Sequence, residues 1–166
     1  MDNIKKRINI VENIITNYFY DNDIHKSSCL AQSYILYKYI CNLIPQNAIN
    51  PILVKGYIIN HEAKIYYGHF WVEYGDNIYD IATETYLLNY ELKCHDKIRS
   101  TMRILVKNIP NNILHKYKNL DHPLFQIIRD TSFKMCMENK FLEDVKEKAP
   151  IDIYEKIKKI YDKLIH

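Results

Sequence analysis

The sequence predicts a single α+β domain in which a central N-terminal helix packs on an antiparallel sheet of short strands and additional helices follow at the C-terminal end. Two segments near the N-terminus carry apolar residues at helical spacing, and the middle of the chain consists of short runs rich in branched and aromatic residues. Helical spacing returns beyond residue 111. With 166 residues and 48% hydrophobic content, the chain has the size and the apolar residues for one core. We expect this core over about 25–108 and a C-terminal helical extension over about 111–166.

The first two helices are predicted from their apolar periodicity. Residues 4–19 have the period of an amphipathic helix, which the polar residues 21–23 end. Residues 29–44 are apolar on nearly every face, which is typical of a helix packed on most sides. This segment is therefore predicted to be the central helix of the fold. Ser27 or Ser28 can cap its N-terminus, and Pro45 follows its end.

Four segments predict the strands of one antiparallel sheet. They are residues 52–59, 64–74, 77–82 and 102–106. Gly75 and Asp76, between the second and third strands, suit a two-residue type II′ turn in which glycine supplies the positive φ. After the sheet, residues 130–148 are predicted to form one helix and residues 151–165 another, the last with an apolar face opposite a charged one.

Charge and composition argue against several classes of function. The 23 basic and 20 acidic residues are spread along the chain without an Arg-rich block, so nucleic acid is not an expected partner. No apolar run approaches the ~20 residues that cross a bilayer, and the N-terminal residues do not resemble a signal peptide, so we expect a cytoplasmic protein without a membrane partner. The four cysteines are widely scattered in a chain without an expected export signal, which favours reduced thiols over disulfides. They include no CxxC pair, so no metal site is indicated.

Cys29 is the candidate nucleophile because it stands at the predicted start of the central helix. A thiol attacks as its thiolate, a form that the exposed N–H groups of a helix N-terminus and an imidazolium partner both favour. The same N–H groups can bind the oxyanion of a tetrahedral intermediate, and the backbone N–H of Cys29 is the candidate donor. In the alternative interpretation, Cys29 is a small core residue of an apolar helix.

His69 and Asp80 are brought together by the register that a two-residue turn imposes. Tyr74 then pairs with Asn77, and Trp71 lies opposite Asp80. His69 is two residues from Trp71, so His69 and Asp80 become diagonal neighbours on one face at ~7–8 Å. A three-residue loop would put them on opposite faces. The residues expected on the other face, directed into the core, are Phe70, Val72 and Ile81.

This arrangement gives each of the three side chains a role. Asp80 would hold one ring nitrogen of His69, while the other nitrogen takes the proton of Cys29 and later protonates the leaving group. Alternatively, His69 is a core histidine and Asp80 a surface residue of the hairpin. Glu73, on the same predicted face, is a rival for orienting His69. Asp80 is preferred because it has apolar neighbours, among which an unpaired carboxylate would be costly.

Three segments of the chain together resemble the transglutaminase-like branch of the papain-like thiol enzymes, especially small members such as lasso-peptide leader peptidases. They are Ser28-Cys29-Leu30-Ala31, Gly68-His69-Phe70-Trp71-Val72-Glu73 and Tyr79-Asp80-Ile81-Ala82-Thr83. The resemblance covers about residues 25–85 and implies a papain-like/transglutaminase-like fold with Cys29 as nucleophile, His69 as general base and acid, and Asp80 as orienter. It also implies a cofactor-free thiol hydrolase that acts on a peptide or amide substrate through an acyl-enzyme, with deamidation or transfer to an amine as a second outcome.

The chain departs from large transglutaminases before the cysteine, where Ser27 and Ser28 replace their glycine-glutamine element. The side-chain part of the oxyanion hole is therefore open, and the candidates for substrate or oxyanion binding are Ser28, Asn22, Gln32 and Trp71. The C-terminal helices resemble no part of the family. They suggest an alternative function, in which a catalytically inactive domain of the same fold binds a protein partner through these helices. A structural domain unrelated to the family would lack a Cys29–His69 contact altogether.

Overall fold

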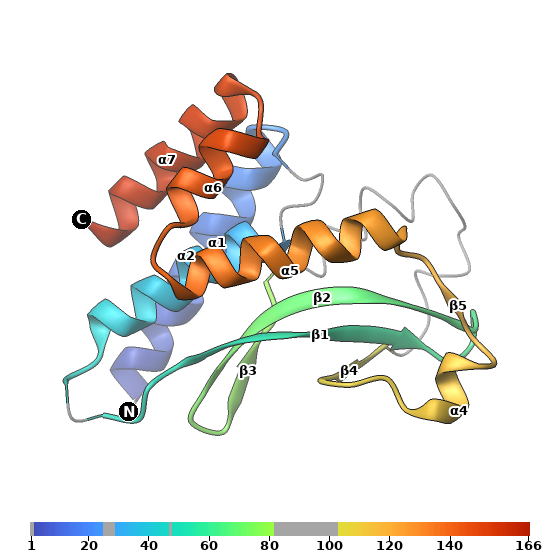
Figure 1. The fold of residues 1–166 in the computed structure, drawn as a ribbon. Helices are drawn as coiled ribbons and strands as arrows, with labels where there is room; N and C mark the ends of the chain where they lie inside the picture. The colour runs from blue at the N-terminus through green and yellow to red at the C-terminus, as the bar shows by residue number, and fades with distance from the viewer. Residues whose placement is uncertain (1, 25–28, 47, 82–102) are drawn as a thin grey trace.

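The computed structural model describes residues 2–24, 29–46, 48–81 and 103–166, and the fold is mixed α+β, with helices around a curved sheet (Figure 1). The predicted α+β class is thus confirmed. In chain order the elements are α1 (Asp2–Asp21), α2 (Cys29–Leu43), β1 (Ile52–Asn60), β2 (Ile65–Tyr74), β3 (Asn77–Tyr79), β4 (Arg103–Val106), α4 (Asn111–Leu114), β5 (Lys118–Asn119), α5 (Pro123–Met137), α6 (Phe141–Lys148) and α7 (Ile151–Ile165).

The sheet has the strand order β3-β2-β1-β4 with antiparallel neighbours, and β5 pairs in parallel with the first residues of β2. The predicted hairpin is confirmed, since Tyr74 pairs with Asn77 and Gly75 has a φ of 58°. Strand β3 ends earlier than predicted, at Tyr79, and residue 82 lies outside the described residues. Before Val72, where the pairing with β3 has ended, β2 contacts α2 instead: Ser33 Oγ donates to the carbonyl of Phe70 at 3.0 Å.

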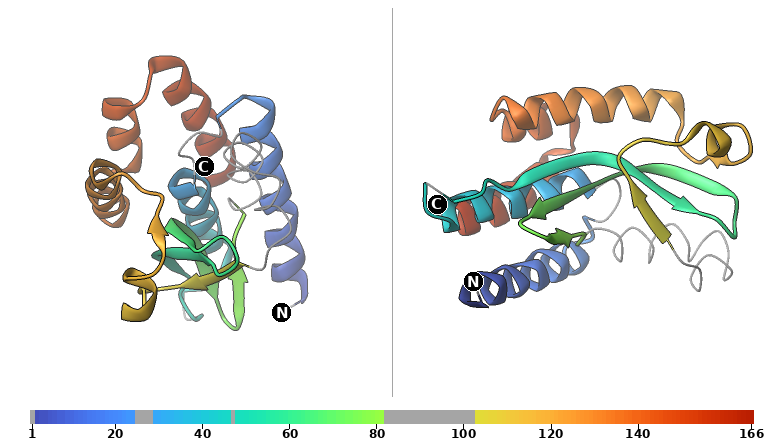
Figure 2. Two further views of the ribbon diagram at one scale, coloured as in Figure 1. Left: turned by 90° about the vertical axis from the view of Figure 1, so that its right-hand side faces the viewer. Right: turned by 90° about the horizontal axis from the view of Figure 1, so that it is seen from below.

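Helix α2 is the centre of the fold, as predicted from its apolar faces. It contacts α1, α5, α7 and the strands β1 and β2. Figure 2 shows α5 on one side of the sheet and α1 on the other. Phe70, Val72 and Ile81 are buried in the main core, as expected from the strand alternation. His69 and Trp71, which alternate with them, are also buried, so β2 is covered on both of its faces.

The prediction of one helix over 130–148 is wrong, because the chain forms α5 and α6 with a break between them. Asn139 adopts a φ of 58° at the break, a left-handed conformation that asparagine tolerates better than most residues after a helix end. Helix α5 also begins earlier than predicted, at Pro123, where the side chain of His122 accepts a hydrogen bond from the backbone N–H of Leu124 at 3.2 Å. None of the helices within the described residues combines the length and the apolar character needed to cross a membrane.

Candidate active site

Helix α2 and strand β2 place Cys29 and His69 in contact. Cys29 is the first residue of α2 and is 8% exposed, and His69 lies in the middle of β2 and is 1% exposed. The thiol of Cys29 lies beside the imidazole of His69, close enough to raise the pKa of the ring through a hydrogen bond and through its charge. The bond from Ser33 to the carbonyl of Phe70 fixes the second turn of α2 against β2, one residue beyond His69. The local packing of helix on strand therefore holds the two reactive groups together.

Asp80 reaches the opposite side of the imidazole. Its Oδ1 lies 2.5 Å from Nε2 of His69, and its side chain is 18% exposed. Asp80 follows directly after β3, so the hairpin register brings it to this position from eleven residues along the chain. Because Nε2 is occupied by Asp80, Nδ1 is the ring nitrogen left for the thiol of Cys29. The structure thus brings together the three side chains that the sequence singled out.

The two partners change the ionisation of His69. Burial lowers the pKa of His69, but the hydrogen bonds with Asp80 and Cys29 and the charge of Asp80 outweigh it and raise the pKa from 6.5 to about 9. The imidazole is therefore protonated at neutral pH. A protonated imidazole in contact with a thiol favours the thiolate, which is the form that attacks a carbonyl carbon.

Trp71 covers the imidazole of His69 on the same face of the sheet. The two rings are nearly parallel, with centroids 6.4 Å apart and an angle of 23° between their planes. The indole Nε1 donates to Glu73 Oε1 at 3.1 Å, and Lys107 donates to the other oxygen of Glu73 at 2.8 Å. Trp71 therefore does not present its N–H to the thiol as the predicted oxyanion donor. Glu73 is likewise paired with Trp71 and Lys107 rather than with His69, so among the carboxylates that the structure describes it is Asp80 that contacts the imidazole.

Gly56 makes room for this indole, and replacing it with alanine is expected to lower the free energy of unfolding by ~1–3 kcal/mol through overpacking. A Cβ atom at Gly56 would lie 2.3 Å from the Trp71 ring and 2.6 Å from the carbonyl oxygen of Val106. Trp71 is the single tryptophan of the chain, so its fluorescence reports the displacement during a urea titration. Gly75→Ala is the control for backbone strain without steric contact, because its φ of 58° disfavours alanine while no atom lies within 4 Å of the added methyl group. It should lower the stability without changing the fluorescence of the folded protein, and equal changes in that fluorescence in both variants would contradict the steric explanation.

The other predicted oxyanion donors lie in different surroundings. Gln32 is fully buried in α2, one turn after Cys29. Asn22 is directed away, since its Nδ2 donates to the carbonyl of Tyr18 at 2.8 Å at the end of α1. Ser28 lies outside the described residues. The backbone N–H of Cys29 remains a candidate, because the first N–H groups of a helix have no partner within it.

Two neighbours of the site carry no signal in the sequence. Glu12 of α1 lies close enough to Asp80 that burial, and then the charge of Asp80, raise the pKa of Glu12. Arg129 of α5 contacts the backbone of Gly68, the residue before His69. Neither belongs to a motif, and both are far along the chain from the residues they meet. Only the packing of α1 and α5 around the sheet reveals them.

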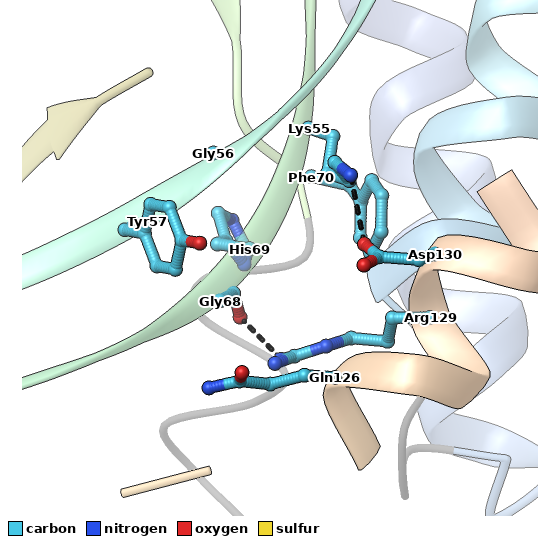
Figure 3. A pocket seen from close by; sticks show the side chains of 9 residues that line it. All are labelled: Lys55, Gly56, Tyr57, Gly68, His69, Phe70, Gln126, Arg129 and Asp130. Carbon is cyan, nitrogen blue, oxygen red and sulfur yellow. Dashed lines mark hydrogen bonds and ion pairs between the residues drawn. The ribbon is translucent and has the colours of Figure 1, made fainter. Parts of the chain in front are cut away.

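A small pocket separates α5 from the sheet (Figure 3). It is lined by Lys55, Gly56, Tyr57, Gly68, His69, Phe70, Gln126, Arg129 and Asp130. The strand pairing puts Lys55 opposite Phe70 and Tyr57 opposite Gly68, so these residues share one face of the sheet. The side chains of His69 and Trp71 alternate with them and lie on the other face. The pocket therefore lies on the face of the sheet opposite to the imidazole. Its lining includes Arg129, which contacts β2 at Gly68 from that face.

No protein-family model matches this chain, and neither a curated protein nor a solved structure is significantly similar to it. In the described parts of the chain, no three His, Cys, Asp or Glu side chains are grouped so that they could hold a metal ion. The geometry of Cys29, His69 and Asp80 is therefore the feature that points to a function.

Proposed function

We propose that this protein is a thiol hydrolase that cleaves a peptide or amide bond through an acyl-enzyme, with Cys29 as nucleophile, His69 as general base and acid, and Asp80 as the residue that orients His69. The observation that carries the proposal is the continuous contact of thiol, imidazole and carboxylate, supplied by three separate segments around a buried ring. We also propose a papain-like/transglutaminase-like architecture, supported by a helix that begins at the cysteine and packs against the strand of the histidine.

The proposed reaction begins with the thiolate of Cys29 and the imidazolium of His69. The sulfur attacks the carbonyl carbon, and the carbonyl oxygen takes the negative charge, for which the backbone N–H of Cys29 is a donor. His69 then gives its Nδ1 proton to the leaving nitrogen as the C–N bond breaks, which leaves a thioester. Water adds to this thioester and gives a proton back to His69, and the thiolate leaves. Asp80 keeps the Nε2–H bond throughout, so the ring stays aligned.

The nature of the second nucleophile separates the outcomes of this chemistry. Water gives peptide cleavage or deamidation, and an amine gives transfer. The acyl-enzyme and the three residues are common to all of these reactions. We place hydrolysis first because water is always present in solution, whereas transfer requires that a separate amine substrate reach the thioester.

The alternative function, a catalytically inactive domain that binds a protein partner, has one observation in its favour. The first half of α5, in the C-terminal extension, exposes the apolar side chains of Leu124, Phe125, Ile127 and Ile128. Such a domain, however, has no use for a buried histidine that is joined to both a thiol and a carboxylate. The contacts of His69 therefore favour the enzyme.

The proposal predicts that iodoacetamide labels Cys29 rapidly near pH 6 and that His69→Ala slows this labelling on the order of tenfold or more, because the thiolate loses its imidazolium partner. Mass spectrometry resolves the labelling of each cysteine. Cys41 is the internal control: burial raises its pKa, it lies in the same helix, and no described contact joins it to His69. Equal labelling rates for Cys29 in both proteins would refute an activated thiol and would support the binding domain instead.

A further inference from the structure

Arg129 of α5 and Asp121, which lies just before α5, form an ion pair against the backbone of Gly68. The pair is bidentate, with Nη2 of Arg129 2.5 Å from Oδ2 of Asp121 and Nη1 3.1 Å from Oδ1. Gly68 N–H donates to Asp121 Oδ2 at 2.6 Å, and Arg129 Nη1 donates to the carbonyl of Gly68 at 3.1 Å. Both polar backbone groups of Gly68 are thus held by one ion pair, whose side chains are 22% and 9% exposed.

The ion pair occupies a stretch of β2 that has a strand on one edge only. Strand β3 pairs with β2 from Val72 to Tyr74, and β5 pairs with Ile65 and Tyr66. Between these contacts no described strand covers that edge of β2. The carbonyl of Gly68 belongs to the peptide group that also contains the N–H of His69. Arg129 therefore restrains the peptide group between Gly68 and His69. In a fully paired strand, a neighbouring strand would provide this restraint.

The absence of a side chain at position 68 is what lets Arg129 approach. A Cβ atom on Gly68 would lie 2.5–2.6 Å from three atoms of the Arg129 guanidinium group. Figure 3 shows this guanidinium reaching across to Gly68 from α5. Glycine is also the most flexible residue of a strand, so its backbone gains most from an external restraint. The residue before His69 thus has no side chain, and the ion pair uses this space to bind its backbone.

We infer that Arg129 and Asp121 are positioning residues for His69, holding its backbone so that the imidazole meets Cys29 and Asp80 at once. Their effect on catalysis rests on the proposed thiol chemistry, whereas their effect on the geometry of His69 does not. A displacement of about 1 Å at a reacting group can cost on the order of 10²-fold in rate, so a restraint on one peptide plane has a measurable consequence.

The structure offers a matched control in the next residue of the same helix. Asp130 forms an ion pair with Lys55 of β1 at 2.7 Å, so it also links α5 to the sheet, but it does not contact Gly68 (Figure 3). Asp130→Asn breaks this exposed link and leaves the backbone before His69 restrained. Asp121→Asn and Arg129→Lys each keep a polar side chain of similar length, so we expect the fold to be retained while the bidentate geometry is lost.

The first experiment follows the titration of the His69 ring by NMR in the wild type and in the three variants. We expect the pKa of His69 to fall by about one unit or more towards 6.5 in Asp121→Asn and Arg129→Lys, because a displaced ring loses part of its hydrogen bond with Asp80. Asp130→Asn should leave the titration unchanged. The same His69 pKa in all four proteins would overturn the inference, whatever the activity of the thiol.

The second experiment measures iodoacetamide labelling of Cys29 at pH 6 in the same proteins and in double variants with His69→Ala. Asp121→Asn and Arg129→Lys should slow labelling about tenfold, and this effect should vanish when His69 is already alanine. An effect that persists undiminished without His69 would show that the ion pair merely stabilises the fold, and would overturn the inference. Equal labelling of the wild type and His69→Ala would refute the proposed function alone, since the His69 titration still decides the positioning.

Discussion

Replacing Asp80 with asparagine is expected to slow the formation of the acyl-enzyme by on the order of 10²- to 10⁴-fold while the fold is retained. The carboxylate lies 2.5 Å from Nε2 of His69 and is one of the groups that raise the pKa of this ring to about 9. Asparagine has nearly the same shape but no charge, so the imidazolium loses its stabilising partner. The side-chain amide can also donate to Nε2, which would select the ring tautomer that puts the proton on Nδ1 in a neutral ring.

The measurement is the burst of p-nitrophenol that accompanies acylation of Cys29 by p-nitrophenyl acetate, followed by stopped flow. Glu73→Gln is the matched control, because Glu73 is the carboxylate on the same face of the hairpin that pairs with Trp71 and Lys107 instead of His69. We expect this control to change the burst rate less than about tenfold, since its contact with His69 passes through an indole ring. A larger loss in Glu73→Gln than in Asp80→Asn would exchange the roles of the two carboxylates.

The contact between His69 and Asp80 could be predicted because it depends on local geometry. Gly75 fixes a two-residue turn, and the turn fixes the pairing of Tyr74 with Asn77. The alternation of side chains along the two strands then puts His69 and Asp80 on the same face. Each step involves neighbours within about a dozen residues. The burial of α2 on most sides likewise followed from its composition alone.

The parts that could not be predicted depend on contacts between distant segments. Arg129 meets Gly68 across 61 residues, and no periodicity or motif connects them. The sequence shows that Trp71 has an indole N–H that could bind an oxyanion. That this N–H donates to Glu73 instead depends on the rotamers of the two side chains, which the sequence does not reveal. The break between α5 and α6 depends on the left-handed backbone of Asn139, which an apolar pattern that continues on both sides conceals.

The stability of the folded protein is expected to fall as the pH rises from about 6.5 to about 9, because His69 loses its proton over this interval. The pKa of His69 is raised on folding, from 6.5 to about 9, since the hydrogen bonds with Asp80 and Cys29 outweigh the effect of burial. A raised pKa means that the folded state holds the proton more tightly than the unfolded chain. The resulting contribution is complete below pH 6.5 and is lost above pH 9, and 2 to 3 pKa units correspond to on the order of 3 kcal/mol.

Urea unfolding at pH 6, 7.5 and 9, in the wild type and in His69→Gln, isolates this contribution. Burial also raises the pKa of Cys41 and that of Cys136, the latter to about 12, so these thiols lower the stability of both proteins at alkaline pH. Their contribution cancels in the difference between the two proteins. This difference should shrink steadily as the pH rises, because His69 is the group that glutamine removes. A difference that is constant with pH would mean that folding leaves the pKa of His69 near 6.5, and at pH 7.5 and above the thiol of Cys29 would then lack the imidazolium that the proposed chemistry requires.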